Sequence, residues 1–249
     1  MLTEQTLTKL KDMRLEGMAE AYERQRSDPE AAALSFDERF GMLVEREWVH
    51  QQERALQRRL KNARLRQNAC IEDLKCDERR GLKREVIAQL SDSHWIACGQ
   101  HCIVTGATGV GKSYLACALA QKACRDGYKA LYTYAPRFFR DLYSAHADGT
   151  LARFLRRMSR FHLLVVDDWG MEQAKRSQYR HFLEMLEERQ GRGSMLITSQ
   201  FPPDTWHETI GDATVADAIL DRLIHGAYRI DLKGESMRKQ DNGAKSQSG

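Results

Sequence analysis

A glycine-rich segment at 106–113, GATGVGKS, has the residue types and spacing of a loop that binds nucleotide phosphates. It follows a short apolar run and precedes a helical pattern, a context in which backbone N–H groups point inward at phosphate oxygens. Lys112 would reach the β- and γ-phosphates of ATP, and the Ser113 hydroxyl would coordinate Mg²⁺. The predicted nucleotide contacts are Gly106, Ala107, Thr108, Gly109, Val110, Gly111, Lys112, Ser113 and Tyr114.

Two adjacent acidic residues, Asp167 and Asp168, end a second apolar run that covers 161–166. Ligands bind at the carboxyl ends of the strands in open parallel sheets, so we expect both carboxylates near the glycine loop. Asp167 would hold Mg²⁺ through its water shell. Asp168 would orient or polarise the water that attacks the γ-phosphate.

Polar side chains that follow later elements could complete this site. A third apolar strand ends in Ser199 and Gln200, and its end should lie beside the end of the acidic strand. Either residue could contact the γ-phosphate or position water. Arg222 follows a helical run, and Arg238 follows the last predicted strand. An arginine near a γ-phosphate offsets the charge that develops in phosphoryl transfer, and one supplied by a neighbouring subunit makes hydrolysis depend on assembly.

Short apolar runs alternate with helical patterns from about residue 101 onward, with helices expected at 112–125 and 176–190. This alternation predicts an α/β fold, in which helices cover both faces of a parallel five-stranded sheet. The acidic strand comes after one intervening strand, an order that favours ATPases acting on macromolecules over nucleotide kinases. The predicted strands are His101–Thr105, Lys129–Tyr134, His162–Asp167, Ser194–Ser199 and Tyr228–Leu232.

Composition divides the chain into four segments. Residues 1–66 have few glycines and apolar residues at helical spacing, which predicts a small helical domain that binds DNA or a partner. Residues 67–98 read as a linker with short helices, and 99–238 as the ATPase domain. The polar residues 239–249 are expected to be a disordered tail.

Charge and cysteine usage indicate a cytoplasmic protein. The 249 residues carry a formal net charge of +4, a mild excess that permits a nucleic-acid partner without demanding one. The first residues are charged, and no apolar run approaches the length of a membrane span. The six cysteines form no C-x-x-C pair, so reduced thiols and the absence of a membrane partner are the simplest expectation.

Two basic segments are candidates for contact with DNA phosphates. The first contains six cations and no acid, and on one continuous helix its residues would form stripes that track a phosphate backbone. The second lies just before the acidic strand. No base-reading motif appears, so contacts with little sequence preference are expected. The candidates are Arg54, Arg58, Arg59, Lys61, Arg64, Arg66, Arg153, Arg156, Arg157 and Arg160.

The chain resembles the IstB family of ATP-binding proteins over nearly its whole length. The resemblance is carried by five segments, GATGVGKS, LLVVDDWG, LITSQ, ILDRL and GESMRK. That family comprises AAA+ transposition helpers of bacterial insertion sequences and is related to DnaC-type helicase loaders. The resemblance implies that Lys112 and Ser113 are Walker A residues and that Asp167 and Asp168 are Walker B residues. It also implies that Gln200 is sensor 1, Arg222 an arginine finger and Arg238 sensor 2.

Two positions depart from the general AAA+ pattern, because Walker B usually ends in Asp-Glu and sensor 1 is usually Asn. With Asp168 and Gln200 in these places, hydrolysis could be slow or could need DNA or a partner to align the water.

The resemblance implies an ATPase that forms a homo-oligomer on double-stranded DNA, with ATP between subunits, and that recruits or stimulates a cognate transposase. Three alternatives stay open: a DnaC-type helicase loader, a small-molecule kinase, and a scaffold that binds ATP but barely hydrolyses it.

Overall fold

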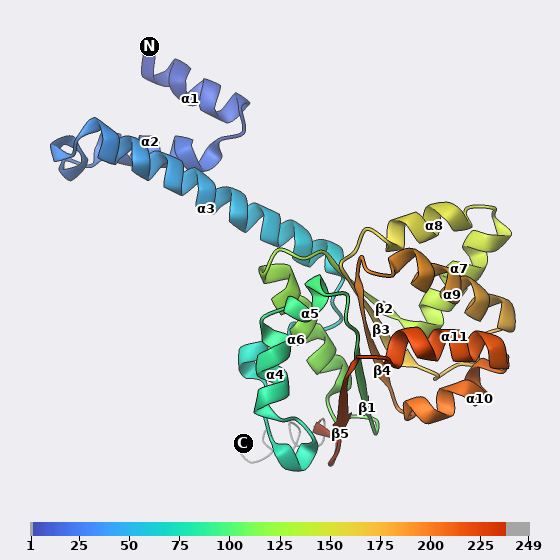
Figure 1. Ribbon diagram of the computed structural model, residues 1–249. Coiled ribbons are helices and arrows are strands. Elements are labelled where there is room, and N and C mark those ends of the chain that lie inside the picture. The colour runs from blue at the N-terminus through green and yellow to red at the C-terminus, as the bar shows by residue number, and fades with distance from the viewer. Residues whose placement is uncertain (1, 238–249) are drawn as a thin grey trace, which may run out of the picture. The chain divides into compact units, whose positions relative to one another are not determined.

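The computed structural model describes residues 2–237, which form two compact units that divide between Arg58 and Arg59 (Figure 1). The division falls inside the long helix α3 (Phe36–Ala63), whereas composition placed it after residue 66. The predicted tail at 239–249 and Arg238 lie outside the described residues.

The N-terminal unit is entirely helical and has a small core. Helix α2 packs on α3 at Gly17, where a Cβ would lie only 2.7 Å from the Cβ of His50. The capping box expected at the start of α3 is present, because the Ser35 N–H donates to the Glu38 carboxylate and the Glu38 N–H donates to Ser35 Oγ. The unit contains α1 (Leu2–Asp12), α2 (Glu16–Ser27), η1 (Glu30–Ala33) and the first part of α3.

The second unit is an α/β fold in which the predicted alternation of strands and helices is confirmed. Its strands are β1 (Cys102–Gly106), β2 (Ala130–Tyr134), β3 (Leu163–Trp169), β4 (Ser194–Ser199) and β5 (Tyr228–Leu232). Its helices are η2 (Ile71–Asp73), η3 (Glu78–Arg80), α4 (Arg84–Ser91), α5 (His94–Ala97), α6 (Lys112–Arg125), α7 (Ala135–Ala147), α8 (Leu151–Met158), α9 (Arg176–Arg189), η4 (Pro203–Thr205), α10 (Trp206–Ile210) and α11 (Ala213–Ile224).

All five strands are parallel, in the order β2-β3-β4-β1-β5. Strand β4 therefore lies between the strand that leads into the glycine loop and the strand that ends in Asp167 and Asp168. The end of β4 lies beside the end of β3, as the sequence predicted, with Val166 opposite Ile197. Parallel strands present their carboxyl ends at one edge of the sheet. The carboxyl ends of β1, β3 and β4 therefore meet at that edge.

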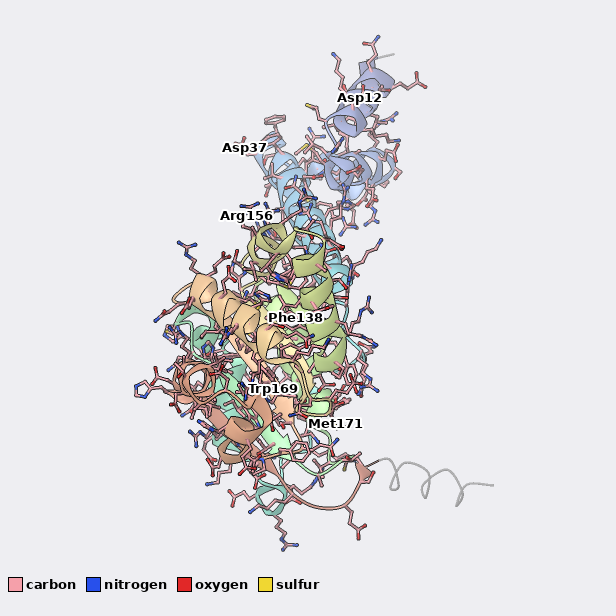
Figure 2. The ribbon with its side chains drawn as sticks, turned by 90° about the vertical axis from the view of Figure 1, so that its right-hand side faces the viewer. Asp12, Asp37, Phe138, Arg156, Trp169 and Met171 are labelled. Atoms are coloured by element: carbon pink, nitrogen blue, oxygen red, sulfur yellow. The ribbon has the colours of Figure 1, made fainter. Side chains whose placement is uncertain are left out.

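Helices cover both faces of this sheet, with α4, α5 and α6 on one side and α7 to α11 on the other (Figure 1). The core beneath α7 and α9 is aromatic, and Figure 2 labels two of its members, Phe138 on α7 and Trp169 at the end of β3. Trp169 is fully buried and packs on Phe182 and Trp206. This packing fixes the end of β3, which carries the two acidic residues.

Across residues 2–237, every helix is too short or too polar to span a lipid bilayer.

Candidate nucleotide-binding site

The glycine loop turns tightly between β1 and α6, and its glycines are required by close approaches. Gly109 has φ +87°, and a Cβ there would lie 2.3 Å from Ser236 Oγ. Gly106 has φ +140°, and a Cβ there would lie 2.2 Å from the Leu232 carbonyl oxygen. Side chains at these positions would displace the end of β5 and the segment that follows it, so the glycines serve both loop curvature and packing.

The Lys112 ammonium lies inside the curl of the loop. It is buried and donates to the carbonyl oxygens of Gly106 at 2.8 Å and Ala107 at 2.9 Å. Burial lowers the pKa of Lys112, while Asp168 and Asp167 oppose that shift. The arrangement holds a cation where it can donate to phosphate oxygens.

Asp167 is fully buried, and hydroxyl groups surround its carboxylate. Ser113 Oγ donates to it, lying 3.0 Å from Oδ1 and 2.9 Å from Oδ2, and Thr198 Oγ1 donates to Oδ1 at 2.5 Å. The Tyr132 hydroxyl from β2 donates to Oδ2. Burial, and then this hydrogen bond, raise the pKa of Tyr132, so the phenol stays protonated as a donor.

The donor set at Asp167 fits Mg²⁺. A carboxylate and a hydroxyl within 3 Å of each other are hard oxygen ligands of the kind this ion prefers. The rest of its coordination sphere would come from water and phosphate oxygens, which is usual for Mg²⁺. Thr198 and Tyr132, the two residues that orient the carboxylate, were not predicted from the sequence. The available sequence signal was a hydroxyl side chain within each of two otherwise apolar strands.

Asp168 has an unusual backbone conformation with φ +59°. The register between β3 and β4 shifts between Val166 and Trp169, and the Asp168 N–H donates to Thr198 Oγ1 at 2.9 Å. The irregular backbone places Asp168 along the wall of the nucleotide cavity. Aspartate tolerates positive φ better than glutamate, because its short polar side chain bonds locally. The local geometry thus favours the shorter acid at this position.

A cavity of about 540 Å³ extends from the glycine loop. Part of its wall comes from the segment after α3, which the sequence analysis assigned only as a linker. Arg80 ties this segment to the loop, because its guanidinium donates to the Val110 carbonyl at 2.8 Å. The cavity is lined by Arg66, Gln67, Asp73, Leu74, Lys75, Arg80, Leu82, Thr108, Gly109, Val110, Gly111, Lys112, Ser113, Tyr114, Leu115, Asp168, Met171, Gln200, Leu232 and Met237.

The two candidates at the end of β4 have different surroundings. Ser199 is fully buried, donates to the Trp169 carbonyl and accepts from the Phe201 N–H. Gln200 lines the cavity, and its amide nitrogen lies 2.9 Å from the Met171 sulfur. Gln200 is therefore the one of the pair with access to bound nucleotide.

Arg222 does not line the cavity of its own chain within the described residues. It lies on α11, donates to the Ala218 carbonyl at 2.9 Å and pairs with Glu187 at 3.1 Å. Arg238 lies outside the described residues, but the Met237 N–H just before it donates to the Gly109 carbonyl at 3.0 Å.

Only part of the first basic segment is helical, because α3 ends at Ala63: Arg54, Arg58, Arg59 and Lys61 lie on α3, whereas Arg64 and Arg66 follow it, so the predicted face that joins Arg59 to Arg66 does not form. Arg59 is half-buried and donates to the Cys124 carbonyl at 2.8 Å, and the Arg66 guanidinium lies 3.7 Å from the Asp167 carboxylate. Arg54 pairs with Glu16 at 2.8 Å. Three of the six predicted cations therefore have contacts within the chain. The exposed side chains without an ion pair to any described residue are Arg58, Lys61 and Arg64.

The second basic segment forms a compact exposed cluster. Arg153, Arg156, Arg157 and Arg160 are all exposed on α8 and the turn after it, and Figure 2 labels Arg156 there. None of the four forms an ion pair with another described residue, and Arg157 lies over the Phe154 ring at 5.2 Å. We name this set the α8 arginine cluster.

Comparison with known proteins finds one family over almost the whole chain. The family model described as IstB-like ATP binding protein matches residues 8–246. The insertion-sequence ATP-binding protein y4pL of Sinorhizobium fredii is 47% identical over 239 residues, which cover 96% of this chain and 98% of that protein.

Solved structures share the fold of the ATPase unit at lower identity. The crystal structure of DnaI has a TM-score of 0.58 and 22% identity, and covers 67% of this chain and 92% of that one. The AMPPCP-bound DnaA of Aquifex aeolicus has a TM-score of 0.59 and 17% identity, and covers 75% of this chain and 57% of that one.

Proposed function

This chain belongs to the IstB-like family of ATP-binding proteins, and on that premise we propose that it is a DNA-binding transposition helper. It is an AAA+ P-loop ATPase. In the proposed function it oligomerises on duplex DNA in the cytoplasm when ATP and Mg²⁺ bind, and it recruits or stimulates a transposase. The observation that carries the proposal is that Lys112 and Ser113 line one cavity and that Ser113 Oγ donates to the buried Asp167 carboxylate behind it.

The residues divide the ATP chemistry among them. Lys112 and the loop N–H groups bind the phosphates, while Ser113 and Asp167 hold Mg²⁺, which supplies charge stabilisation when bound. Asp168 orients the attacking water or accepts a proton from it. Gln200, which also lines the cavity, positions the same water. The DnaA neighbour bound to AMPPCP, an ATP analogue, supports nucleotide binding by this fold.

Arg222 is proposed to act on the nucleotide of a neighbouring copy. Among residues 2–237 it is not part of the cavity lining, which favours a role in trans, and its ion pair with Glu187 holds it on the surface of α11. Arg222→Ala should bind ATP normally yet hydrolyse it poorly. Mixing it with Asp168→Ala should restore activity, because one interface then combines an intact Asp168 with an intact Arg222. No recovery on mixing would remove the support for a trans finger.

The charge distribution favours the ATPase unit as the DNA-binding part. Residues 1–58 carry nine Lys and Arg against twelve Asp and Glu, a net charge of −3. The remaining residues carry 30 against 23, a net charge of +7. The α8 arginine cluster concentrates four of these cations without acidic partners among the described residues. Phosphate contacts of this kind predict steep salt dependence.

The N-terminal unit suits a protein partner better than DNA. Four apolar side chains at i, i+4 spacing on α3, which we name the α3 stripe, remain exposed. A negative unit with an apolar stripe repels DNA but fits an apolar protein segment. We therefore propose that the transposase contacts this unit. The α3 stripe comprises Phe36 at 70% exposure, Phe40 at 50%, Val44 at 45% and Trp48 at 59%.

DNA binding is tested with charge reversals. Arg156→Glu with Arg157→Glu should weaken binding to a labelled duplex at least about tenfold and reduce the salt slope by about 2. Arg137→Glu is the matched control, because Arg137 is exposed on the neighbouring helix α7 and already lies 4.0 Å from Asp141. Equal losses in both variants would argue against the α8 arginine cluster.

Partner identity is tested by capture. The tagged full chain with ATP should retain the transposase encoded beside it and stimulate DNA strand transfer. Retention of the replicative helicase in place of the transposase would instead support a helicase loader. A rise in phosphate transfer with a small hydroxyl compound, while DNA has no effect, would favour a kinase.

A further inference from the structure

Arg66 connects the metal-binding carboxylate to the end of the long helix α3. It lies three residues after Ala63, the last residue of α3, and its side chain is 51% exposed. The guanidinium lies 3.7 Å from Asp167 Oδ2, hydrogen-bonds to Tyr132 and lines the nucleotide cavity. The Tyr132 hydrogen bond raises the pKa of Arg66, and Asp167 and Asp168 add to that shift. Among the described residues, no other Lys or Arg forms an ion pair with Asp167.

This guanidinium and Mg²⁺ would both be drawn to one buried carboxylate. The buried carboxylate carries a single negative charge, so the half-exposed guanidinium and the metal would compete for the same oxygens and repel each other at short range. Oδ2 already accepts from Tyr132 and Ser113, which limits the space for a further ligand. Metal binding beside Ser113 therefore requires the Arg66 side chain to withdraw or to weaken its contact.

We propose that Arg66 is a positioning residue that competes with Mg²⁺ for Asp167 and so sets the Mg²⁺ concentration at which nucleotide binds tightly. The inference rests on the proposed role of Asp167 in holding Mg²⁺. It goes beyond that role because it identifies the internal cation that the metal must displace.

Release of the Arg66 side chain does not require unfolding of its segment. The buried Cys117 thiol on α6 lies near the backbone of Gln67 and Arg66, which opposes the rise that burial causes in the pKa of Cys117. The side chain is half exposed, so it can leave the carboxylate by rotating toward solvent. The contact can therefore open and close with the arrival of the metal.

The other cations around the cavity have different contacts and supply a control. Arg80 donates to the Val110 carbonyl, so it supports the glycine loop. Lys75 is exposed, lines the cavity and forms no ion pair with a described residue. Removing Lys75 changes the charge of the cavity by the same amount as removing Arg66 but leaves Asp167 untouched.

The test is the binding of a fluorescent ATP analogue to the full chain, titrated against Mg²⁺ and repeated in EDTA. Arg66→Ala should lower the half-saturating Mg²⁺ concentration roughly five- to tenfold and leave binding in EDTA within about twofold. Arg66→Lys, which keeps the charge, should stay nearer the wild type. Lys75→Ala should weaken binding with and without Mg²⁺ alike and leave the Mg²⁺ midpoint unchanged. Thermal melting without nucleotide verifies that each variant is folded.

Two results would overturn the inference. One is a folded Arg66→Ala protein whose Mg²⁺ midpoint is unchanged or higher. The other is a large loss of its binding in EDTA, because Arg66 would then be a phosphate ligand. Asp167→Asn separates the two levels of the argument. A normal Mg²⁺ midpoint in Asp167→Asn refutes the metal role itself, whereas a raised midpoint there beside an unaffected Arg66→Ala refutes only the competition.

Discussion

The two units of this chain differ most in how they bury apolar side chains. The ATPase unit encloses Trp95, Trp169, Trp206 and Phe182 almost completely. Within residues 3–58, the buried apolar residues are only Leu10, Ala19 and Ala31, while the α3 stripe and Met42 stay exposed. Burial of large apolar side chains is the main source of folding free energy, so the ATPase unit provides its own stability. The N-terminal unit keeps apolar surface available for a partner.

This difference fits the two tasks proposed for the chain, nucleotide binding and recruitment of a partner. A phosphate site needs a rigid frame, and the aromatic packing of Trp169 gives the end of β3 that rigidity. The proposed recruitment surface needs exposed apolar contacts, and the α3 stripe offers them. Substitutions in one unit should therefore leave the task of the other intact.

The largest effect is expected at Lys112. Lys112→Ala removes the buried ammonium of the glycine loop and should weaken ATP binding roughly 1,000-fold, about 4 kcal/mol, with loss of ATP-dependent assembly on DNA. Isothermal titration with ATP measures the change. Lys122→Ala on the same helix is the control, because Lys122 pairs at the surface with Asp126. Normal assembly of Lys112→Ala would contradict the phosphate-binding role.

The next effect concerns pH and the ATPase unit. Burial lowers the pKa of His101 from 6.5 to about 4, and its Nδ1 accepts from the Met195 N–H at 3.1 Å. As pH falls, His101 is protonated in the unfolded chain before it is protonated in the folded protein. The stability that the neutral, buried His101 gives is therefore complete above pH 6.5 and is lost as pH falls toward 4. The loss should reach about 3 kcal/mol. Denaturant melts between pH 7 and pH 4 measure it, and His101→Gln should flatten the profile. An equally steep profile in that variant would assign the effect elsewhere.

A smaller effect, confined to the N-terminal unit, is expected on the α3 stripe. Trp48→Ser should weaken transposase binding by about 2 kcal/mol, the usual cost of losing an aromatic anchor, while ATP affinity and stability stay unchanged. Met13→Ser is the matched control, since Met13 is an exposed apolar residue of the same unit outside the stripe. A loss of ATP binding in Trp48→Ser would break the separation of the two units.

The smallest effect is expected at Asp168. Asp168→Glu puts a longer side chain at φ +59° and should destabilise the ATPase unit by about 1 kcal/mol without raising hydrolysis. Asp168→Asn tolerates that φ, so it should keep its stability and lose hydrolysis. Calorimetry and phosphate release report the two quantities. Faster hydrolysis by Asp168→Glu would mean that the backbone geometry does not favour the shorter acid.

The parts predictable from sequence are those encoded locally. The strand that carries Asp167 and the helix that begins at Lys112 follow from apolar periodicity and the glycine loop, and the structure has both, with the strand running two residues further to Trp169. Thr198 and Tyr132 were not predicted as hydrogen-bond donors to Asp167, because only the strand order brings their hydroxyls to its carboxylate. Arg66 looked like one more cation on a basic helix. Its contact with a carboxylate about a hundred positions later in the chain is visible only in the folded structure.

The most direct test of the account is the mass of the particles that the purified chain forms on a duplex, compared with and without a non-hydrolysable ATP analogue and Mg²⁺. The account predicts a defined multi-subunit complex when both are supplied and a dispersed, low-order population when either is withheld. A single copy on the duplex under every condition, or the same assembly without nucleotide, would contradict it.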